Sequence, residues 1–191
     1  FAGNIGDAQD FPAILAAAES LKSHAHIRWL IVGDGRMSGW VAEEIRRRHL
    51  QDCVYMLGRH PVERMPSFFK HANALLVSLK DEPIFSMTIP GKLQSYLASG
   101  IPVAAMLNGE GAEVVRSSRA GLTCPAGDHA GLAAAVLKLS QMTHEEHDAM
   151  GRNGRDASVR EFDRDKLISQ LEEWLETLRF EVVSPMMRRG K

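Results

Sequence analysis

Residues 79–103 read LKDEPIFSMTIPGKLQSYLASGIPV, which we interpret as a strand end, a polar loop, a helix and the next strand. Pro90 suits the first turn of that helix, because its missing N–H would have no partner there. Gly91 allows a ligand to approach the backbone, and Lys92 adds its charge to the partial positive charge of the helix N-terminus. The pattern predicts a phosphate site; the alternative is an ordinary strand-to-helix corner with a solvated lysine.

The same alternation of short apolar segments and helical patterns continues along the chain. It predicts an α/β fold, with a Rossmann-like parallel sheet of about six strands and helices on both faces. Helix-capping residues are expected at four positions, where an aspartate or threonine precedes a helical pattern: Asp10, Asp128, Thr143 and Asp163. The expected strands are residues 1–4, 27–32, 54–57, 74–77, 102–106 and 121–124.

The chain has 191 residues, 45% of them hydrophobic and 25% charged, which is typical of a globular domain. We expect one domain over residues 1–180 and a flexible tail over residues 181–191. The net charge of −1 does not indicate binding to nucleic acid or to an anionic membrane. No apolar run reaches the roughly 20 residues of a membrane span. Two cysteines, Cys53 and Cys124, are expected as buried thiols in a cytoplasmic protein.

The C-terminal part is expected to be helical. Residues 150–155, MGRNGR, should interrupt or bend the first of its helices, and Asp163 should begin a long amphipathic one. We expect that helix to end near Arg179 and to cover either this sheet or a further domain. Its apolar face contains Leu167, Ile168, Leu171, Trp174, Leu175 and Leu178. All three tryptophans, Trp29, Trp40 and Trp174, are expected to be core residues.

Parallel sheets bind ligands outside the carboxyl ends of their strands. The segments at those ends contain many of the glycines and acidic residues of the chain, together with Arg59, which favours a ligand that carries phosphate. Eight histidines show no zinc-ligand spacing, so no metal site is expected. The segments are residues 4–9, 33–35, 59–61, 80–90 and 108–113.

One alternative comes from residues 33–39, GDGRMSG, which follow a predicted strand and precede a predicted helix. A glycine pair in this position is found in dinucleotide-binding domains, so an NAD-dependent oxidoreductase domain is a second hypothesis. The signal is weak, because the first strand should carry it and no acidic residue ends the following strand.

The order of these loops resembles the C-terminal, donor-binding domain of retaining GT-B glycosyltransferases, family 4-like and of the bacterial surface-polysaccharide type. The resemblance covers residues 1–178. Its individual motifs are short, and their order along the chain carries the resemblance. The matching segments are residues 32–35 (VGDG), 57–59 (LGR), 96–103 (YLASGIPV), 111–115 (GAEVV), 120–122 (AGL), 125–128 (PAGD) and 150–155 (MGRNGR).

The resemblance implies an enzyme that moves a sugar from a nucleotide diphosphate sugar to a lipid-linked or saccharide acceptor. The donor would be UDP-linked, with an N-acetylated amino sugar as one candidate. An N-terminal acceptor domain, absent from this chain, would supply the acceptor site and any membrane contact at the inner face of the membrane. This chain would then be inactive alone and would need no cofactor or metal.

The resemblance also implies residue roles. Lys92, Arg59 and Glu82 are the expected catalytic residues, with Asp81 as the alternative to Glu82 for sugar or ribose hydroxyls. Residues 58–61 would hold the uracil. The expected donor-binding residues are Asn4, Gly6, Gly33, Asp34, Gly35, Arg59, His60, Pro90, Gly91, Lys92, Glu110 and Glu113.

Two departures from the family pattern bear on these roles. Ser95 stands where the family commonly has a ribose-binding glutamate, so Glu110 or Glu113 would have to replace it. The first loop, residues 4–9, contains no basic residue, so Arg59 and Lys92 would carry more of the diphosphate charge. These departures keep open a non-catalytic nucleotide-sugar-binding module. A sugar-nucleotide 2-epimerase, which shares the architecture, is a further alternative.

Overall fold

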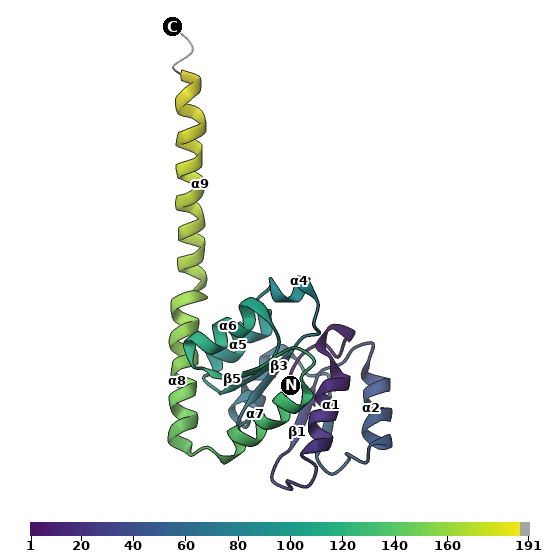
Figure 1. Ribbon diagram of the computed structural model, residues 1–191. Helices are drawn as coiled ribbons and strands as arrows, with labels where there is room; N and C mark the ends of the chain where they lie inside the picture. Colours follow the sequence, from purple (N-terminus) through teal and green to yellow (C-terminus); the bar gives the residue numbers. More distant parts are fainter. Residues whose placement is uncertain (188–191) are drawn as a thin grey trace.

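The computed structural model describes the backbone of residues 1–187 and the side-chain surroundings of residues 1–178 (Figure 1). Its strands are β1 (Trp29–Val32), β2 (Val54–Gly58), β3 (Leu75–Ser78), β4 (Val103–Met106) and β5 (Gly121–Cys124). Its helices are η1 (Asp7–Gln9), α1 (Phe11–Ser20), α2 (Ser38–Arg47), η2 (Val62–Arg64), α3 (Met65–Lys70), α4 (Pro83–Ser86), α5 (Gly91–Ser99), α6 (Gly109–Ser118), α7 (His129–Gln141), α8 (His144–Glu161) and α9 (Arg164–Met187).

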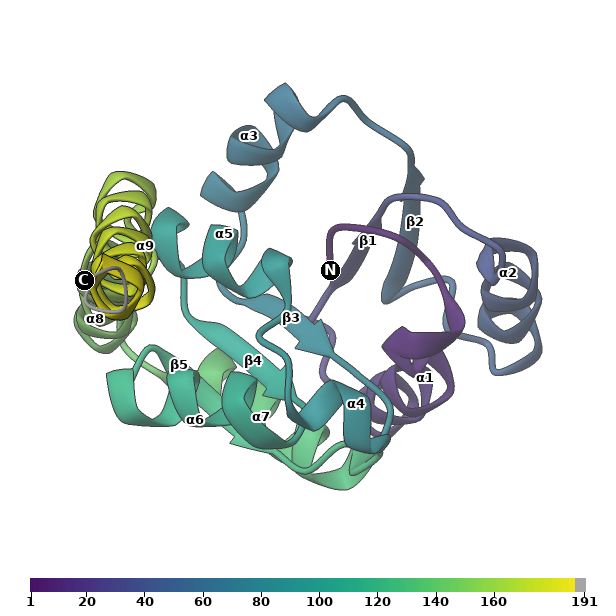
Figure 2. The same cartoon turned by 90° about the horizontal axis from the view of Figure 1, so that it is seen from above.

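The strands form two parallel sheets, β1–β2 and β3–β4–β5, which lie side by side (Figure 2). The predicted α/β architecture with parallel strands is confirmed. The expected number of about six strands is wrong, because the described residues form five strands. The difference arises at residues 1–4, where Ala2 makes only an isolated bridge to Val32.

Helices cover both faces of the larger sheet, as expected. Alternate residues of a strand point to opposite faces. Leu76 and Ala104 therefore pack into a core that also contains side chains of α1 and α7. Their neighbours Leu75 and Val103 pack into a second core with α5 and α6. The two cores fix α5 on one face, with its N-terminus near the carboxyl ends of the strands.

All four predicted caps are confirmed. Thr143 accepts from the Glu146 amide at 3.2 Å, and the Glu146 carboxylate accepts from the Thr143 amide at 2.8 Å. Aspartate carboxylates at the starts of the other helices each accept from a backbone amide. These bonds join Asp10 to Ala13 (3.4 Å), Asp128 to Gly131 (2.8 Å) and Asp163 to Lys166 (2.9 Å).

Three expected helix boundaries are corrected. Pro90 is the N-cap of α5 and not a first-turn residue. Helix α6 begins at Gly109, so Glu110 belongs to its first turn and not to a loop. Helix α8 runs without interruption through residues 150–155. A β-carbon on Gly151 would lie 2.1 Å from the Gly100 carbonyl oxygen, so this glycine allows α8 to approach α5 and does not break the helix.

Helix α9 extends to Met187, beyond the expected end near Arg179, so residues 181–187 are helical. Residues 188–191, the rest of the expected tail, lie outside the described residues. Trp174 is 57% exposed, which contradicts its expected place in the core, whereas Trp29 and Trp40 pack against the core as expected. None of the described helices combines the length and the apolar composition that crossing a membrane requires.

Candidate functional site

The loops that follow residue 2, β1 and β3 are tied together at the carboxyl ends of the strands. The Ile5 amide donates to the Asp34 carbonyl oxygen at 2.8 Å, and the Lys80 amide donates to the Ala8 carbonyl oxygen at 2.9 Å. The Lys80 ammonium group also pairs with the Asp7 carboxylate at 2.6 Å. The first loop, residues 4–9, therefore bridges the two sheets at the edge where parallel sheets bind ligands.

Gly33 and Gly35, both predicted ligand contacts, have a structural role in this arrangement. Gly33 has a φ of +142°, and a β-carbon there would lie 1.9 Å from the Gly3 carbonyl oxygen. A β-carbon on Gly35 would lie 2.3 Å from the Ile5 carbonyl oxygen. The close approach of the first loop therefore accounts for both glycines without a ligand.

Asn4 and Gly6 also lie within this junction. The Asn4 side-chain amide lies between Gly6 and Gly35, with its nitrogen 2.6 Å from the position of a Gly6 β-carbon. The Gly6 amide donates to the Gln9 side chain at 3.0 Å. The structure thus brings Asn4, Gly6 and the β1 loop together, as the sequence predicted.

The N-terminus of α5 is open. No side chain caps it, and a β-carbon on Gly91 would meet nothing within 4 Å. The first amides of a helix have no acceptor within the helix itself. Packing within the described chain gives no reason for glycine at this position, unlike Gly33 and Gly35. The amides of Gly91 and Lys92 are therefore accessible to an anion.

Lys92 extends from this helix end to the first loop. Its Nζ atom is buried, has no hydrogen-bond partner among the described residues, and lies 3.9 Å from the centroid of the Phe1 ring. A β-carbon on Gly3 would lie 3.2 Å from it. Burial lowers the pKa of Lys92 to about 8. An ammonium group buried without a hydrogen-bonded or ionic partner is costly, and an anion bound beside it would remove much of that cost.

Arg59, His60 and Asp34 lie at the ends of β1 and β2. Hydrogen bonds from the Ser38 hydroxyl (2.8 Å) and the Gly35 amide (2.7 Å) lower the pKa of Asp34, and the Arg59 charge lowers it further. Arg59 is exposed. His60 Nε2 lies 3.1 Å from the Leu57 carbonyl oxygen. Asp34 therefore stabilises the start of α2, and Arg59 is available to a ligand.

The predicted carboxylates have different surroundings. Glu82 and Glu110 are exposed and form no ion pair within residues 1–178. Glu113 pairs with Arg116 of the same helix, α6, and both side chains are exposed. Asp81 accepts a hydrogen bond from the Asn108 side chain at 2.8 Å. Glu82 and Glu110 thus remain available, whereas Asp81 and Glu113 are engaged.

Sequence reasoning missed three residues that hold the site together. Lys80 pairs with Asp7, as described above, and Asn108 joins Asp81 to the Ala126 amide, which donates to it at 3.1 Å. The Tyr96 hydroxyl accepts from the Ala2 amide at 3.0 Å and donates to the Ala2 carbonyl oxygen at 3.1 Å. Lys80 and Asn108 belong to the predicted ligand-binding segments, so their position in the sequence could have identified them. Tyr96 belongs to a helical pattern, which predicted that its side chain is buried but not that its hydroxyl binds Ala2.

A metal site was not expected. Within the part of the chain that the structure describes, no group of three or more histidine, cysteine, aspartate or glutamate side chains is arranged to hold a metal ion. The arrangement offers instead open backbone amides, one buried cation and one exposed cation beside glycine-rich loops. These groups suit a diphosphate.

The model of the family described as Glycosyl transferases group 1 matches residues 1–142. N-acetyl-alpha-D-glucosaminyl L-malate synthase from Bacillus anthracis is 24% identical over 159 residues, covering 83% of this chain and 40% of that protein. Amylovoran biosynthesis glycosyltransferase AmsK from Erwinia amylovora is 31% identical over 114 residues, covering 59% of this chain and 28% of that protein. The crystal structure of Anabaena Alr3699/HepE in complex with UDP matches with a TM-score of 0.79 and 17% identity, covering 92% of this chain and 47% of that one.

The chain spans less than half the length of each of these proteins. Its fold is that of the C-terminal domain of GT-B glycosyltransferases, as the sequence resemblance predicted. Because the family model matches most of the chain, the chain belongs to the Glycosyl transferases group 1 family.

Proposed function

We propose that this chain is the donor-binding half of a retaining glycosyltransferase that uses a UDP-linked N-acetylated amino sugar. The observation that carries the proposal is the buried Lys92 ammonium group, which lacks a hydrogen-bond partner among the described residues and lies at the open N-terminus of α5. The choice of UDP is supported by HepE, whose crystal structure contains UDP. The choice of sugar is supported by the name of the Bacillus anthracis relative.

The geometry suits stabilisation of a leaving diphosphate. Breaking the bond between sugar and phosphate develops negative charge on the diphosphate. The amides of Gly91 and Lys92, the dipole of α5 and the Lys92 and Arg59 charges would stabilise it. Losing one such fixed group typically costs about 10²–10³ in rate. We propose Lys92 and Arg59 as catalytic residues in this sense.

The position of Lys92 compensates for the missing basic residue of the first loop. Residues 4–9 contain no lysine or arginine. Lys92 Nζ nevertheless lies directly against Gly3, so α5 supplies a cation beside that loop. We propose that the diphosphate binds between the first loop and the N-terminus of α5, with Asn4 and Gly6 on the opposite side from Gly91.

The remaining roles follow from exposure and from partners. Glu82, exposed before α4 and engaged in no ion pair of the described part, would bind donor-sugar hydroxyls in the catalytic site. Glu110 would contact the ribose in place of the glutamate that Ser95 replaces. His60 and its loop would contact the uracil. Glu113 is not proposed as a ligand residue, because Arg116 engages it.

The acceptor site would belong to a further, N-terminal domain of the whole enzyme, with a lipid-linked or saccharide acceptor. We therefore propose that this chain alone does not transfer sugar, and that no metal or cofactor takes part. Its buried thiols, Cys53 and Cys124, support a reducing compartment and hence the cytoplasm. Sugar transfer by the isolated chain would contradict the proposal that the acceptor site belongs to a separate domain.

Calorimetric titration of the chain with UDP, GDP and NAD tests the proposal. We expect UDP to bind, and the substitution Lys92→Met to weaken its binding at least tenfold. Methionine keeps an apolar stem of similar length and removes the charge. Lys138→Met on α7, at an exposed position, is the matched control and should bind as the unsubstituted chain does. Binding of NAD alone would favour the alternative hypothesis of an NAD-dependent oxidoreductase domain.

Proton linkage at pH 8 gives a second readout. Because the pKa of Lys92 is lowered to about 8, roughly half of the free chains carry a neutral Lys92 at that pH. A bound diphosphate favours the charged form, so binding should take up protons. Titrations in buffers of different ionisation enthalpy measure this uptake, which should vanish in Lys92→Met. If a demonstrably folded chain binds none of the three nucleotides, the proposed site is not functional in this chain.

A further inference from the structure

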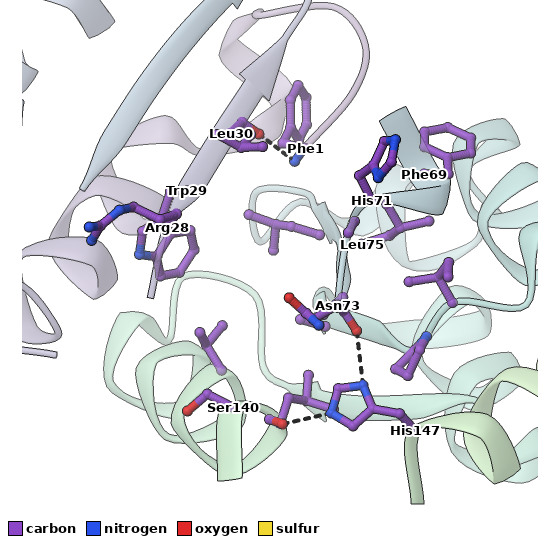
Figure 3. A pocket seen from close by; sticks show the side chains of 18 of the residues that line it. Phe1, Arg28, Trp29, Leu30, Phe69, His71, Asn73, Leu75, Ser140 and His147 are labelled. Atoms are coloured by element: carbon purple, nitrogen blue, oxygen red, sulfur yellow. Dashed lines mark hydrogen bonds between the residues drawn. The ribbon is translucent and has the colours of Figure 1, made fainter. Parts of the chain in front are cut away.

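The loop that carries Glu82 lies apart from the cavity between the two sheets. That cavity, of about 710 Å³, lies between β1 and β3 and is lined mainly by residues 26–32 and 68–76 (Figure 3). Residues 81–90 are not among its lining residues, and the Glu82 side chain is exposed. The position of Glu82, which we propose for donor-sugar hydroxyls, therefore depends on contacts between the loops at the carboxyl ends of the strands.

Asn108 is the N-cap residue of α6, but its side chain does not cap that helix. Asparagine is among the residues that best cap a helix, because its side-chain oxygen can accept from the amides of the first turn. Here the side-chain nitrogen donates to the Asp81 carboxylate at 2.8 Å, and the side-chain oxygen accepts from the Ala126 amide at 3.1 Å. The residue thus gives up its usual bond for two bonds to the loops that follow β3 and β5.

The two partners of Asn108 match an amide side chain. An ionised carboxylate such as that of Asp81 only accepts hydrogen bonds, whereas the backbone amide of Ala126 only donates them. A side chain between them must do both, and the asparagine amide does both from adjacent atoms. The substitution Asn108→Asp would keep the acceptor for Ala126 but would place a second carboxylate against Asp81, where like charges repel.

Two glycines at the start of α6 bring the same loop close. A β-carbon on Gly109 would lie 1.8 Å from the Ser86 carbonyl oxygen, so a larger residue could not be accommodated there. A β-carbon on Gly111 would lie 3.1 Å from Pro90 Cδ, which is also tight. The first turn of α6 therefore lies against the end of α4 and against the N-cap of α5, and the bond to Asp81 adds a third point of contact.

Glu82 lies within this segment, directly after Asp81. The Glu82 amide donates to the Lys80 carbonyl oxygen, and the Glu82 carbonyl oxygen accepts from the Phe85 amide, each at 3.0 Å. The Glu82 side chain makes no capping bond to α4. The backbone of Glu82 is thus held while its carboxylate is free, which suits a group that must meet a ligand in a defined position.

We infer that Asn108 is a positioning residue of the donor site. By holding Asp81 it fixes the direction of the backbone at Glu82, so that the Glu82 carboxylate meets the hydroxyl groups of the donor sugar. The inference rests on the proposed function. It adds that the loops after β4 and β5 determine how the sugar is held, in distinction from the nucleotide.

Calorimetric titration of the 191-residue chain with UDP and with UDP-N-acetylglucosamine tests the inference. The ratio of the two affinities isolates the contribution of the sugar. We expect Asn108→Asp and Asn108→Ala to lower the affinity for the nucleotide sugar about tenfold relative to that for UDP. Asn153→Asp on α8 is the matched control and should leave the ratio unchanged, because its side chain donates to the Arg119 carbonyl oxygen outside the candidate site.

A reciprocal exchange tests whether Asn108 acts through Asp81. In the double variant that combines Asp81→Asn with Asn108→Asp, the side chain at position 81 would donate to the one at position 108. The second oxygen at position 108 would still accept from the Ala126 amide. Because the bridge is restored and the net charge is unchanged, the affinity ratio should return close to that of the unsubstituted chain. A purely structural role would instead weaken the binding of both ligands equally.

The variant Glu82→Gln separates failure of this inference from failure of the proposed function. If it lowers the ratio but both Asn108 variants leave the ratio unchanged, Glu82 binds the sugar without Asn108, and only the inference is overturned. Failure of the reciprocal exchange to restore the ratio also overturns it. If Glu82→Gln leaves the ratio unchanged, or if the chain binds neither ligand, the proposed function fails and the inference fails with it. Should Asn108→Asp not fold, Asn108→Ala decides, because it removes the bridge without adding a charge.

Discussion

Helices α5 and α9 both have apolar residues at helical spacing, but the body of the protein covers only α5. In α5, Leu93, Tyr96 and Leu97 are at most 1% exposed. In α9, six large apolar side chains between Leu167 and Leu178 are 43–58% exposed, and the helix leaves the body (Figure 1). Apolar spacing therefore shows that a helix face suits burial, whereas the rest of the fold decides whether this chain buries it.

The largest expected effect contrasts one leucine from each helix. Leu97→Ala removes a side chain that is 0% exposed, so we expect the free energy of unfolding to fall by about 3 kcal/mol. Leu171 is 52% exposed, and Leu171→Ala should change the free energy of unfolding by less than about 0.5 kcal/mol. Urea denaturation measures both. Equal losses would show that α9 packs on the body in solution.

The next prediction breaks the contact between α5 and α8. A β-carbon on Gly151 would lie 2.1 Å from the Gly100 carbonyl oxygen. This oxygen is a backbone atom, so a change of side-chain rotamer cannot relieve the clash. Gly151→Ala should therefore lower the free energy of unfolding by about 2 kcal/mol. Gly39→Ala in α2 is the control, because a β-carbon there meets nothing within 4 Å. The control should be neutral or slightly stabilising, since alanine favours helix; equal losses would mean that α8 does not approach α5 this closely.

The third prediction concerns the pH dependence that Lys92 contributes. Its pKa is about 8 in the folded protein and about 10.4 in an unfolded chain. Between these values the unfolded state binds more protons, so the Lys92 contribution to stability rises with pH. From pH 8 to pH 9.5 we expect the unsubstituted chain to gain about 1.5 kcal/mol relative to Lys92→Met.

Denaturation of both proteins at each pH measures that difference. Burial raises the pKa of the Cys124 thiol to about 12. Above the ordinary pKa of a thiol, this shift makes the free energy of unfolding fall as the pH rises, which is opposite to the effect of Lys92. The Cys124 effect is present in both the unsubstituted chain and Lys92→Met, so it cancels when their free energies of unfolding are subtracted. Parallel pH profiles of the two proteins would show that Lys92 is solvated and not buried.

The smallest expected effect comes from one hydroxyl group of α5. Tyr96→Phe leaves the Ala2 amide and carbonyl groups without the hydroxyl that binds both of them, at a cost of about 1 kcal/mol. The Tyr55 hydroxyl donates to the Asp52 carbonyl oxygen at an exposed position, so Tyr55→Phe should cost less. Thermal denaturation of the two variants compares them. A larger loss for Tyr55→Phe would contradict the role of Tyr96 in anchoring the first loop.

Much of the candidate site could be predicted because it lies in loops that strand order brings to one edge. Asn4 and Arg59 were selected this way, and Lys92 was selected because it follows Pro90 and Gly91 at the start of a predicted helix. The same argument could not tell that Gly33 and Gly35 serve loop packing and that Gly91 does not. That distinction depends on the Gly3 and Ile5 carbonyl oxygens, which are close in space but about 30 residues away in the sequence.

The sequence by itself determined the α/β class, the parallel strands and the four helix caps, because each depends on residues a few positions apart. Only the tertiary structure decided that Gly151 supports packing rather than a break, that α9 remains uncovered, and that the strands form two sheets. It also placed Lys92 under the first loop without a hydrogen-bond partner among the described residues. These features depend on which surfaces meet, and a local pattern records that a surface is apolar or glycine-lined without recording what lies against it.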